Sequence, residues 1–213
     1  MYFHALIPFK PVNPKTRLSC VLDQEEREAF ARCMLDDVIG AVLKSGCSAT
    51  LLCTDPFEHE DALIAVRREP LNDAINWALP QFHCPALIIM ADIPLVRAGD
   101  IQRLVSTAKD MAIVPGRGGG TNAIFLKKPR CFRADYYGAS FLDHMRIAEE
   151  CGFSVEVIDS YRMSTDMDEK EDLVELLIHG RGKSREFLER LGFALSIEKG
   201  RVGVKRRSHE ETL

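Results

Sequence analysis

Hydrophobic and polar positions along the chain form two kinds of segment. Short runs that are apolar at every position, such as 85–90, are typical of strands covered on both faces of a sheet. Longer segments keep their apolar residues on one stripe, as Phe30, Met34 and Val38 do, and this spacing predicts helices. Because such strands alternate with helices, the pattern predicts an α/β fold with a mostly parallel central sheet flanked by helices.

The limits of several elements follow from their end residues. Asp23 is a typical N-cap for the first helix, and Gly46 is a typical residue just beyond its end. Gly152 ends a later helix in the same way. Strands are expected at 2–7, 49–53, 64–66, 85–90, 111–115, 123–126 and 154–159, and further helices at 71–79, 99–110, 140–152, 169–180 and 184–192.

The length of the chain bounds the number of domains. A chain of 213 residues supports one sizeable hydrophobic core, so we expect a single domain over 1–213 with its α/β core over 1–193. Residues 194–213 are expected to form a β-hairpin that turns at Lys199 and Gly200, followed by a charged tail.

Composition and charge narrow the class of protein. A formal net charge of −4 gives no overall attraction for nucleic acid. Neither the N-terminus nor the longest apolar run resembles a targeting or membrane-spanning segment, so we expect no membrane partner and a cytoplasmic location. The seven cysteines include no C-x-x-C pair, which favours buried, reduced thiols over disulfides or a zinc site.

The loop after the first strand concentrates positive charge. In IPFKPVNPKTRLS the cations Lys10, Lys15 and Arg17 lie within eight residues, with no acid among them. Prolines, beginning with Pro8, stiffen this loop, so little entropy is lost when it closes on a ligand. Lysine as a point charge and arginine as a fork suit a polyphosphate. The alternative is an exposed basic loop with no ligand.

Three aspartates are candidate metal ligands. Asp92 follows the buried run 85–90, where a charge is costly unless it is paired, hydrogen-bonded or bound to a metal. A plain helix-cap or turn role explains Asp92 equally well. Asp166 and Asp168 are two residues apart, so an extended backbone would point both toward an ion held by Asp92. The alternative for Asp168 is capping of the next helix.

A glycine-rich turn and a helix start are candidates for anion binding. The turn GRGGGTN, 116–122, can bring backbone N–H groups close to a phosphate or carboxylate, although a hairpin connection explains it equally well. It lacks the spacing of a Walker phosphate loop. Ser140 is placed either to cap its helix or to bind an anion at the helix N-terminus. His144, one turn later, is interpreted as structural rather than catalytic.

Six short motifs resemble those of a known enzyme family. In chain order they are IPFKPVNPKTRLS, LNDAI, MADIPL, GGTNAIFL, SFLDHMRIAEECG and TDMDEKEDL, and they span about residues 3–177. Their order and spacing are similar to those of the guanylyltransferases of deazaflavin coenzyme F-420 biosynthesis, of the archaeal type that acts on 2-phospho-L-lactate. That family is a branch of the nucleotidyltransferases, so the resemblance implies the nucleotide-diphospho-sugar transferase (glycosyltransferase-A-like) fold.

The resemblance implies a role for each candidate residue. Lys15, Arg17 and Asp92 would be catalytic. The family more often has Asp-x-Asp-Thr-Pro where this chain has DMDEK, so which of Asp166 and Asp168 joins Asp92 at the metal stays open. The implied sets are nucleotide-binding Pro8, Lys10, Lys15, Arg17 and Asn72; acceptor-binding Gly119, Thr121, Asn122, Gly138 and Ser140; and Mg²⁺-binding Asp92, Asp166 and Asp168.

The implied reaction is attack by the phosphate of 2-phospho-L-lactate on the α-phosphorus of GTP, with release of pyrophosphate. Phosphoenolpyruvate, 3-phosphoglycerate, a sugar phosphate or the molybdenum cofactor are alternative acceptors. A nucleotide-binding protein without turnover is a further alternative, which the joint presence of Asp92, Asp166 and the basic loop disfavours. The edge of the C-terminal hairpin also predicts a homodimer.

Overall fold

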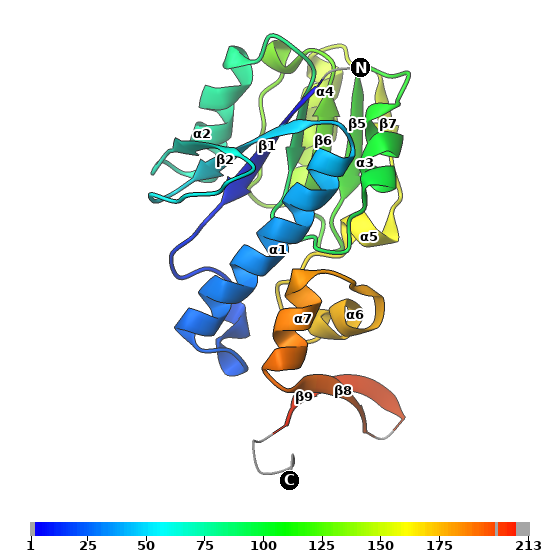
Figure 1. The fold of residues 1–213 in the computed structure, drawn as a ribbon. Helices are drawn as coiled ribbons and strands as arrows, with labels where there is room; N and C mark the ends of the chain where they lie inside the picture. Colours follow the sequence, from blue (N-terminus) through cyan, green and yellow to red (C-terminus); the bar gives the residue numbers. More distant parts are fainter. Residues whose placement is uncertain (1–2, 199, 208–213) are drawn as a thin grey trace.

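A seven-stranded sheet forms the centre of the molecule (Figure 1). The structure, a computed structural model, describes residues 3–198 and 200–207. The strand order is β3-β2-β1-β4-β6-β5-β7. The strands are β1 (His4–Phe9), β2 (Ser48–Cys53), β3 (Leu63–Val66), β4 (Ala86–Ile89), β5 (Met111–Pro115), β6 (Thr121–Leu126) and β7 (Val155–Val157).

Among the strands of residues 3–198 and 200–207, only β6 runs against the common direction of this sheet. It pairs antiparallel with β4 and with β5, and every other pair of neighbouring strands is parallel. The predicted mostly parallel sheet is therefore confirmed. Because β6 is reversed, its first residues, Thr121 and Asn122, lie at the edge where the parallel strands end. This edge, here called the carboxyl rim, also carries the basic loop and Asp92, because the loop follows β1 and Asp92 follows β4.

Helices cover both faces of the sheet. In β1, Ala5 and Ile7 belong to the core that includes α1 and α3, whereas Leu6 belongs to the core that includes α2 and α4. The helices are α1 (Gln24–Lys44), α2 (Leu71–Ala78), α3 (Ala98–Val105), α4 (Ser140–Glu150), α5 (Tyr161–Ser164), α6 (Asp172–His179) and α7 (Lys183–Arg190); the short 3-10 helices are η1 (Thr16–Cys20), η2 (Leu79–Gln81) and η3 (Pro129–Cys131).

The long helix α1 begins and ends as predicted. The Asp23 carboxylate accepts from the Glu26 N–H at 2.8 Å, and the Glu26 carboxylate accepts from the Asp23 N–H at 3.1 Å, which forms a capping box. Gly46, just beyond the helix, has a φ of 86°. The helix therefore starts at a fixed point directly after the basic loop and crosses one face of the sheet (Figure 1).

The C-terminal elements lie beyond the carboxyl rim (Figure 1). The predicted hairpin is confirmed as β8 (Phe193–Glu198) paired antiparallel with β9 (Arg201–Arg206); Lys199 and the tail 208–213 lie outside the described residues. The Asp37 carboxylate of α1 accepts from the Ser184 N–H at 3.0 Å and so caps α7. This contact fixes the C-terminal helices to α1.

The expected helix 99–110 is wrong at its end. The helix α3 stops at Val105, because Ser106 Oγ donates to the Arg103 carbonyl at 2.8 Å and its own N–H closes the last turn. Residues 106–110 form the connection to β5 instead.

The expectations from composition are partly confirmed. The cysteines are free, and burial raises the pKa of Cys47 to about 12 and that of Cys53 to about 11. The prediction of burial is wrong for three cysteines, Cys20, Cys131 and Cys151, which are exposed because they lie in surface turns or at helix ends. Among the helices of the described chain, none is both long and apolar enough to cross a membrane.

Candidate active site

A pocket of about 300 Å³ opens at the carboxyl rim between the basic loop and α1. Ala31 and Met34 of α1 form part of its apolar wall, and the loop supplies most of its charge. The predicted nucleotide-binding and metal-binding residues that line it are Pro8, Lys10, Lys15, Arg17, Asp92 and Asp168. The fold therefore brings the basic loop together with two of the three predicted metal ligands.

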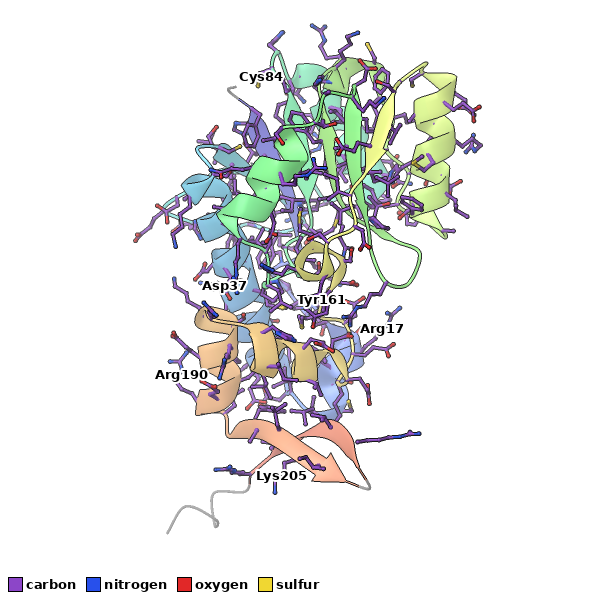
Figure 2. The ribbon with its side chains drawn as sticks, turned by 90° about the vertical axis from the view of Figure 1, so that its right-hand side faces the viewer. Arg17, Asp37, Cys84, Tyr161, Arg190 and Lys205 are labelled. Atoms are coloured by element: carbon purple, nitrogen blue, oxygen red, sulfur yellow. The ribbon has the colours of Figure 1, made fainter. Side chains whose placement is uncertain are left out.

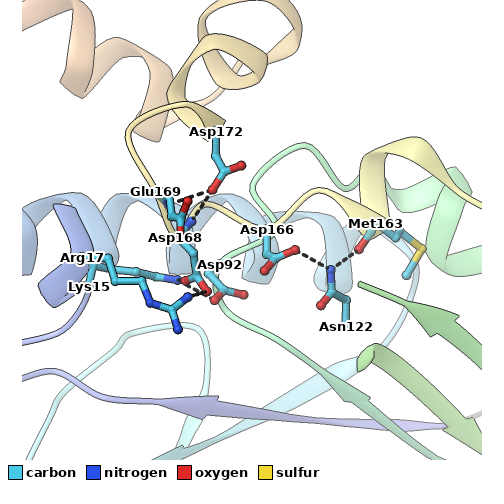
Figure 3. A network of polar contacts seen from close by, with 9 residues as sticks. All are labelled: Lys15, Arg17, Asp92, Asn122, Met163, Asp166, Asp168, Glu169 and Asp172. Carbon is cyan, nitrogen blue, oxygen red and sulfur yellow. Dashed lines mark hydrogen bonds and ion pairs between the residues drawn. The ribbon is translucent and has the colours of Figure 1, made fainter. Parts of the chain in front are cut away.

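Lys15 lies between two carboxylates (Figure 3). Its Nζ is 2.6 Å from Asp92 Oδ2 and 2.6 Å from Asp168 Oδ1. Burial acts to lower the pKa of Lys15, but the two carboxylates outweigh it and raise the pKa above its ordinary value, so the side chain is an ammonium. Arg17 is more exposed, with its Nη1 3.5 Å from Asp168 Oδ2, and Figure 2 shows it near the outside of the molecule.

The backbone of Lys15 adopts a conformation that residues other than glycine rarely adopt. Its φ is 50°, and that of Asn13, two residues earlier, is 46°. Each such conformation costs about 1 kcal/mol or more, and it persists only where the surrounding structure holds it. The contacts that hold this loop therefore determine where the Lys15 ammonium lies.

Asp92 keeps one carboxylate oxygen unused. Its Oδ1 is buried and has no hydrogen-bond partner among the described residues, whereas its Oδ2 bonds to Lys15. Burial, followed by the negative charge of Asp92, raises the pKa of the neighbouring Asp166 carboxyl. Figure 3 draws Asp92 between Asp166 and Asp168. Because hard divalent cations prefer carboxylate oxygens, these residues fit Mg²⁺.

As the side chains stand, no three His, Cys, Asp or Glu residues in the part of the chain that the structure describes are arranged to hold a metal. Lys15 engages both Asp92 and Asp168, while the Asp166 Oδ1 accepts from Asn122 Nδ2 at 3.3 Å. The two aspartates predicted to face one ion therefore meet different partners in this arrangement.

The segment that carries Asp166 and Asp168 is held from two sides. The Asp172 carboxylate of α6 accepts from the Asp168 N–H at 3.0 Å, and the Met167 N–H donates to the Asp92 carbonyl at 2.9 Å. The alternative prediction that Asp168 caps α6 is wrong, because the helix starts only at Asp172. Asp172, the first residue of the helix, instead bonds to the loop before it. The Asp168 side chain is thereby left to pair with Lys15.

Asn122 links β6 to this segment. Its Nδ2 donates to the Met163 carbonyl at 2.9 Å as well as to Asp166. A Cβ atom at Gly116 would lie 2.7 Å from Asn122 Oδ1, so the glycine makes room for the amide. The observed contacts of Asn122 position Asp166; its place in the acceptor pocket stays a prediction.

A second polar cluster lies beside the glycine-rich turn. His144 Nε2 accepts from the Asp135 N–H at 3.0 Å, and because a backbone N–H only donates, the ring hydrogen is on Nδ1. Nδ1 then donates to Thr121 Oγ1 at 2.9 Å, and Ser140 Oγ donates to the same oxygen at 3.3 Å. Ser140 does not cap its helix, since α4 begins with Ser140 itself and its hydroxyl is directed to Thr121.

The residues predicted to bind the acceptor gather around this cluster. Thr121 and Ser140 are buried, whereas Gly119 and Gly138 are exposed. Both glycines have a positive φ, and the Gly119 carbonyl accepts from the Phe141 N–H at 3.2 Å, which binds the turn to the start of α4. The glycine backbone is therefore the exposed part of this cluster, and acceptor binding by these residues stays a prediction.

Replacement of His144 by glutamine is expected to weaken the acid dependence of stability. His144 is fully buried, and burial lowers its pKa to about 4; the negative charges of Asp135 and Asp143 oppose this shift, and the positive charge of Arg133 adds to it. The His144 imidazole binds a proton near pH 6.5 in the unfolded chain but only near pH 4 in the folded chain. The free energy of unfolding therefore falls as the pH drops from 6.5 toward 4. Urea unfolding should show that the wild type loses about 2 kcal/mol more than His144→Gln between pH 7 and pH 5.

The exposed His179 provides the matched control for this prediction. His179→Gln should keep the slope of the wild type, because the fold leaves this side chain exposed to solvent. An identical slope in His144→Gln and wild type would show that His144 is not held neutral by the fold.

Asn72 of α2 serves the loop before α4. Its Nδ2 donates to Asp135 Oδ1 at 2.7 Å, and its Oδ1 accepts from the Tyr136 N–H at 2.7 Å. Both ends of the amide are thus engaged with the loop that also bonds to His144. The predicted proximity of Asn72 to the nucleotide stays a prediction.

Sequence reasoning does not identify Arg27, although the structure gives it a place beside the site. It lies three residues before Phe30 on the buried stripe of α1 and is 7% exposed. A charge on an otherwise apolar stripe is the sequence feature that points to such a residue. The contacts of its guanidinium with the basic loop are described below.

Solved structures with similar coordinates define the class of this fold. A nucleotide-diphospho-sugar transferase from Desulfovibrio desulfuricans superposes with a TM-score of 0.74 at 17% identity, covering 89% of this chain and 95% of that one. The 2-C-methyl-D-erythritol 4-phosphate cytidylyltransferase of Thermus thermophilus gives a TM-score of 0.56 at 12% identity, covering 89% and 100%. The protein therefore has the nucleotide-diphospho-sugar transferase fold.

Sequence comparison identifies the family within this class. The chain belongs to the family described as guanylyl transferase CofC like, which matches residues 3–209. It is 82% identical to the 2-phospho-L-lactate guanylyltransferase of Methanoculleus marisnigri, with all of both chains covered, and 68% identical to that of Methanocorpusculum labreanum over 99% of each. The family indicated by the six motifs is thus confirmed.

Proposed function

We propose that this protein joins GTP to 2-phospho-L-lactate and forms lactyl-2-diphospho-5′-guanosine and pyrophosphate. The observation that carries the proposal is the cluster of Lys15, Asp92 and Asp168 at the carboxyl rim, inside a basic pocket. The names of the relatives at 82% and 68% identity supply the guanylyl group and the acceptor.

The reaction exchanges one phosphoanhydride bond for another. A phosphate oxygen of 2-phospho-L-lactate attacks the α-phosphorus of GTP, and the bond from that phosphorus to the bridging oxygen of the β-phosphate breaks, so that the electron pair leaves with pyrophosphate. The attacking oxygen is already anionic near neutral pH, and no general base is needed. The protein must instead bring two anions together in line and neutralise their charge.

The basic loop supplies the cations of the protein for this task. Lys15 is a buried ammonium that now pairs with Asp92 and Asp168, and on nucleotide binding it turns toward the phosphate oxygens. Arg17 is exposed at the mouth of the same pocket, where its fork suits two oxygens of a phosphate. Lys10 lines the pocket and adds a third positive charge.

Asp92, Asp166 and Asp168 are the residues that would hold Mg²⁺. When bound, Mg²⁺ supplies positive charge that offsets the charge of the phosphates and orients them. Asp92 Oδ1 is available without the loss of a hydrogen bond to any described residue, whereas Asp92 Oδ2 and Asp168 must first release Lys15. The ammonium and the metal therefore share these two carboxylates.

Pyrophosphate release from GTP with Mg²⁺ tests the proposal. The acceptors compared are 2-phospho-L-lactate, phosphoenolpyruvate and 3-phosphoglycerate, each with GTP and with ATP. Release with GTP and 2-phospho-L-lactate alone supports the proposal in full. Release with another acceptor would overturn the proposed acceptor and keep the type of reaction. If the folded protein released no pyrophosphate with any of these acceptors, the proposed function would be overturned.

A homodimer through the C-terminal hairpin is part of the proposal. The hairpin exposes Leu195, Ile197 and Val202, at 42%, 78% and 53%. Such apolar side chains beside an open strand edge form a surface that a second copy can cover. We expect sedimentation at micromolar concentration to show a dimer, and Ile197→Lys to shift it toward monomer. A monomer in the wild type would rule out the dimer and leave the proposed reaction untouched.

A further inference from the structure

Arg27 is a buried cation whose contacts lead to the basic loop. Its Nη2 donates to Asn13 Oδ1 at 2.8 Å, its Nε to the Pro14 carbonyl at 3.2 Å, and its Nη1 to the Leu22 carbonyl at 3.2 Å. The next residue of α1, Glu28, accepts from the Asn13 N–H at 2.9 Å. The N-terminal part of α1 therefore holds the loop at Asn13 and Pro14 and also bonds to Leu22, just before the helix.

These contacts surround the backbone of Asn13 and Pro14, which directly precedes Lys15. Asn13 and Lys15 both have a left-handed backbone, and Pro14 lies between them. Arg27 and Glu28 bond to Asn13 through its side chain and its backbone, and Arg27 also bonds to the Pro14 carbonyl. Strained backbone of this kind persists only where its surroundings hold it. The observed hydrogen bonds are well placed to hold it.

A guanidinium suits this position better than any other cation. Its planar group carries five N–H donors in a fixed geometry, so one side chain reaches three acceptors in different directions. All three acceptors are neutral oxygens, which makes the hydrogen bonds directional supports of the loop rather than ion pairs. A lysine at this position would keep the charge and lose part of the geometry.

We propose that Arg27 is a positioning residue for nucleotide binding, which holds the basic loop so that Lys15 and Arg17 are presented to the triphosphate before the ligand arrives. The inference rests on the proposed function and concerns how its site is preformed. Arg27 acts through the loop, because its guanidinium is buried and its nitrogens are engaged with oxygens of Asn13 and Pro14 in the loop and of Leu22. A preformed loop spares the ligand the cost of ordering it.

The test uses Arg27→Lys, Arg27→Met and Asn13→Gly. The last variant removes an acceptor outside the core and still allows the left-handed backbone, so it remains informative if Arg27→Met fails to fold. In these variants we expect the Kd of GTP with Mg²⁺, measured by calorimetry, to rise about tenfold relative to the wild type. We expect kcat/KM for GTP to fall by about 10²-fold in Arg27→Met, with the KM for 2-phospho-L-lactate unchanged.

Amide hydrogen exchange gives a readout that does not depend on activity. Without ligand, exchange of the peptide 10–22 should be faster in Arg27→Lys than in the wild type, while that of β4 stays the same. A merely structural role would instead accelerate exchange throughout the protein. Exchange of the peptide 10–22 in the double variant of Arg27→Lys with Asn13→Gly should be little faster than in Arg27→Lys alone, because both changes break the same contact between Arg27 and Asn13.

Arg146→Met is the matched control. It removes an exposed guanidinium whose partners, Asp143 and Glu150, lie on α4, so GTP binding and exchange of 10–22 should be those of the wild type. Unchanged GTP affinity and unchanged loop exchange in folded Arg27→Lys would overturn the positioning role. If the wild type itself binds no GTP, the proposed function fails, and loop exchange in Arg27→Lys still decides whether Arg27 holds the loop.

Discussion

Replacement of Asp92 by asparagine is expected to lower turnover by at least about 10³-fold. Asp92 Oδ2 pairs with the Lys15 ammonium, and its buried Oδ1 has no hydrogen-bond partner among the residues described, as a ligand position requires. Asparagine keeps the shape of the side chain and removes its charge. It would also turn an amide N–H group toward either the ammonium or the metal position, and both contacts are repulsive.

The measurement is pyrophosphate release with GTP, Mg²⁺ and 2-phospho-L-lactate, in protein shown to be folded by its thermal unfolding. Asp110→Asn is the matched control, because this carboxylate precedes β5 at the opposite edge of the sheet and accepts from Ser154 Oγ at 2.6 Å. It should keep the turnover of the wild type. If folded Asp92→Asn also kept wild-type turnover, Asp92 would have no part in the reaction.

The carboxyl rim is the part of the site that the sequence predicts well. The runs 85–90 and 111–115 are apolar at every position, as buried parallel strands require. Since parallel strands end at one edge, the basic loop and Asp92 can be assigned to the same rim without knowledge of any contact. The strand order and the reversal of β6 were not needed for that assignment, although β6 is what brings Asn122 there.

The partners of the side chains at this rim depend on contacts that the sequence does not contain. Asp166 meets Asn122, 44 residues away, and Gly116 must lack a side chain for that amide to fit. Lys15 has the charge expected of a phosphate ligand, yet it pairs with Asp92 and Asp168 because these carboxylates are the nearest anions within the protein. Residue types at a rim can be predicted, but pairings between distant segments require the coordinates.

Arg27 shows a different limit. Its charge on the buried stripe of α1 is visible in the sequence, and it indicates that something polar must face that helix. The acceptors, however, are an amide oxygen and two backbone carbonyls, and those of Asn13 and Pro14 lie in the part of the loop with left-handed backbone at Asn13 and Lys15. No spacing of residue types encodes those positions.

Replacement of Lys15 by methionine is expected to have two opposite effects. Turnover should fall by about 10²- to 10³-fold, because the buried cation that meets the phosphates is lost. Binding of Mn²⁺ without nucleotide should become tighter, because Asp92 and Asp168 lose the ammonium that lies 2.6 Å from each and keep their own charges. Partly buried carboxylates without a countercharge favour any cation that can replace it.

The Mn²⁺ affinity, measured by electron paramagnetic resonance, is compared among the wild type, Lys15→Met and Lys10→Met. Lys10 lines the same pocket and is exposed, so its loss should change Mn²⁺ binding much less than the loss of Lys15 does. Mn²⁺ should also raise the Tm of Lys15→Met more than that of the wild type, because tighter binding to the folded state stabilises it more. Weaker Mn²⁺ binding in folded Lys15→Met would contradict a shared site. A fall in turnover alone cannot show whether Lys15 and the metal share these carboxylates, because the loss of a phosphate contact and the loss of a metal site both lower turnover. The change in Mn²⁺ affinity distinguishes the two cases, because its sign differs between them.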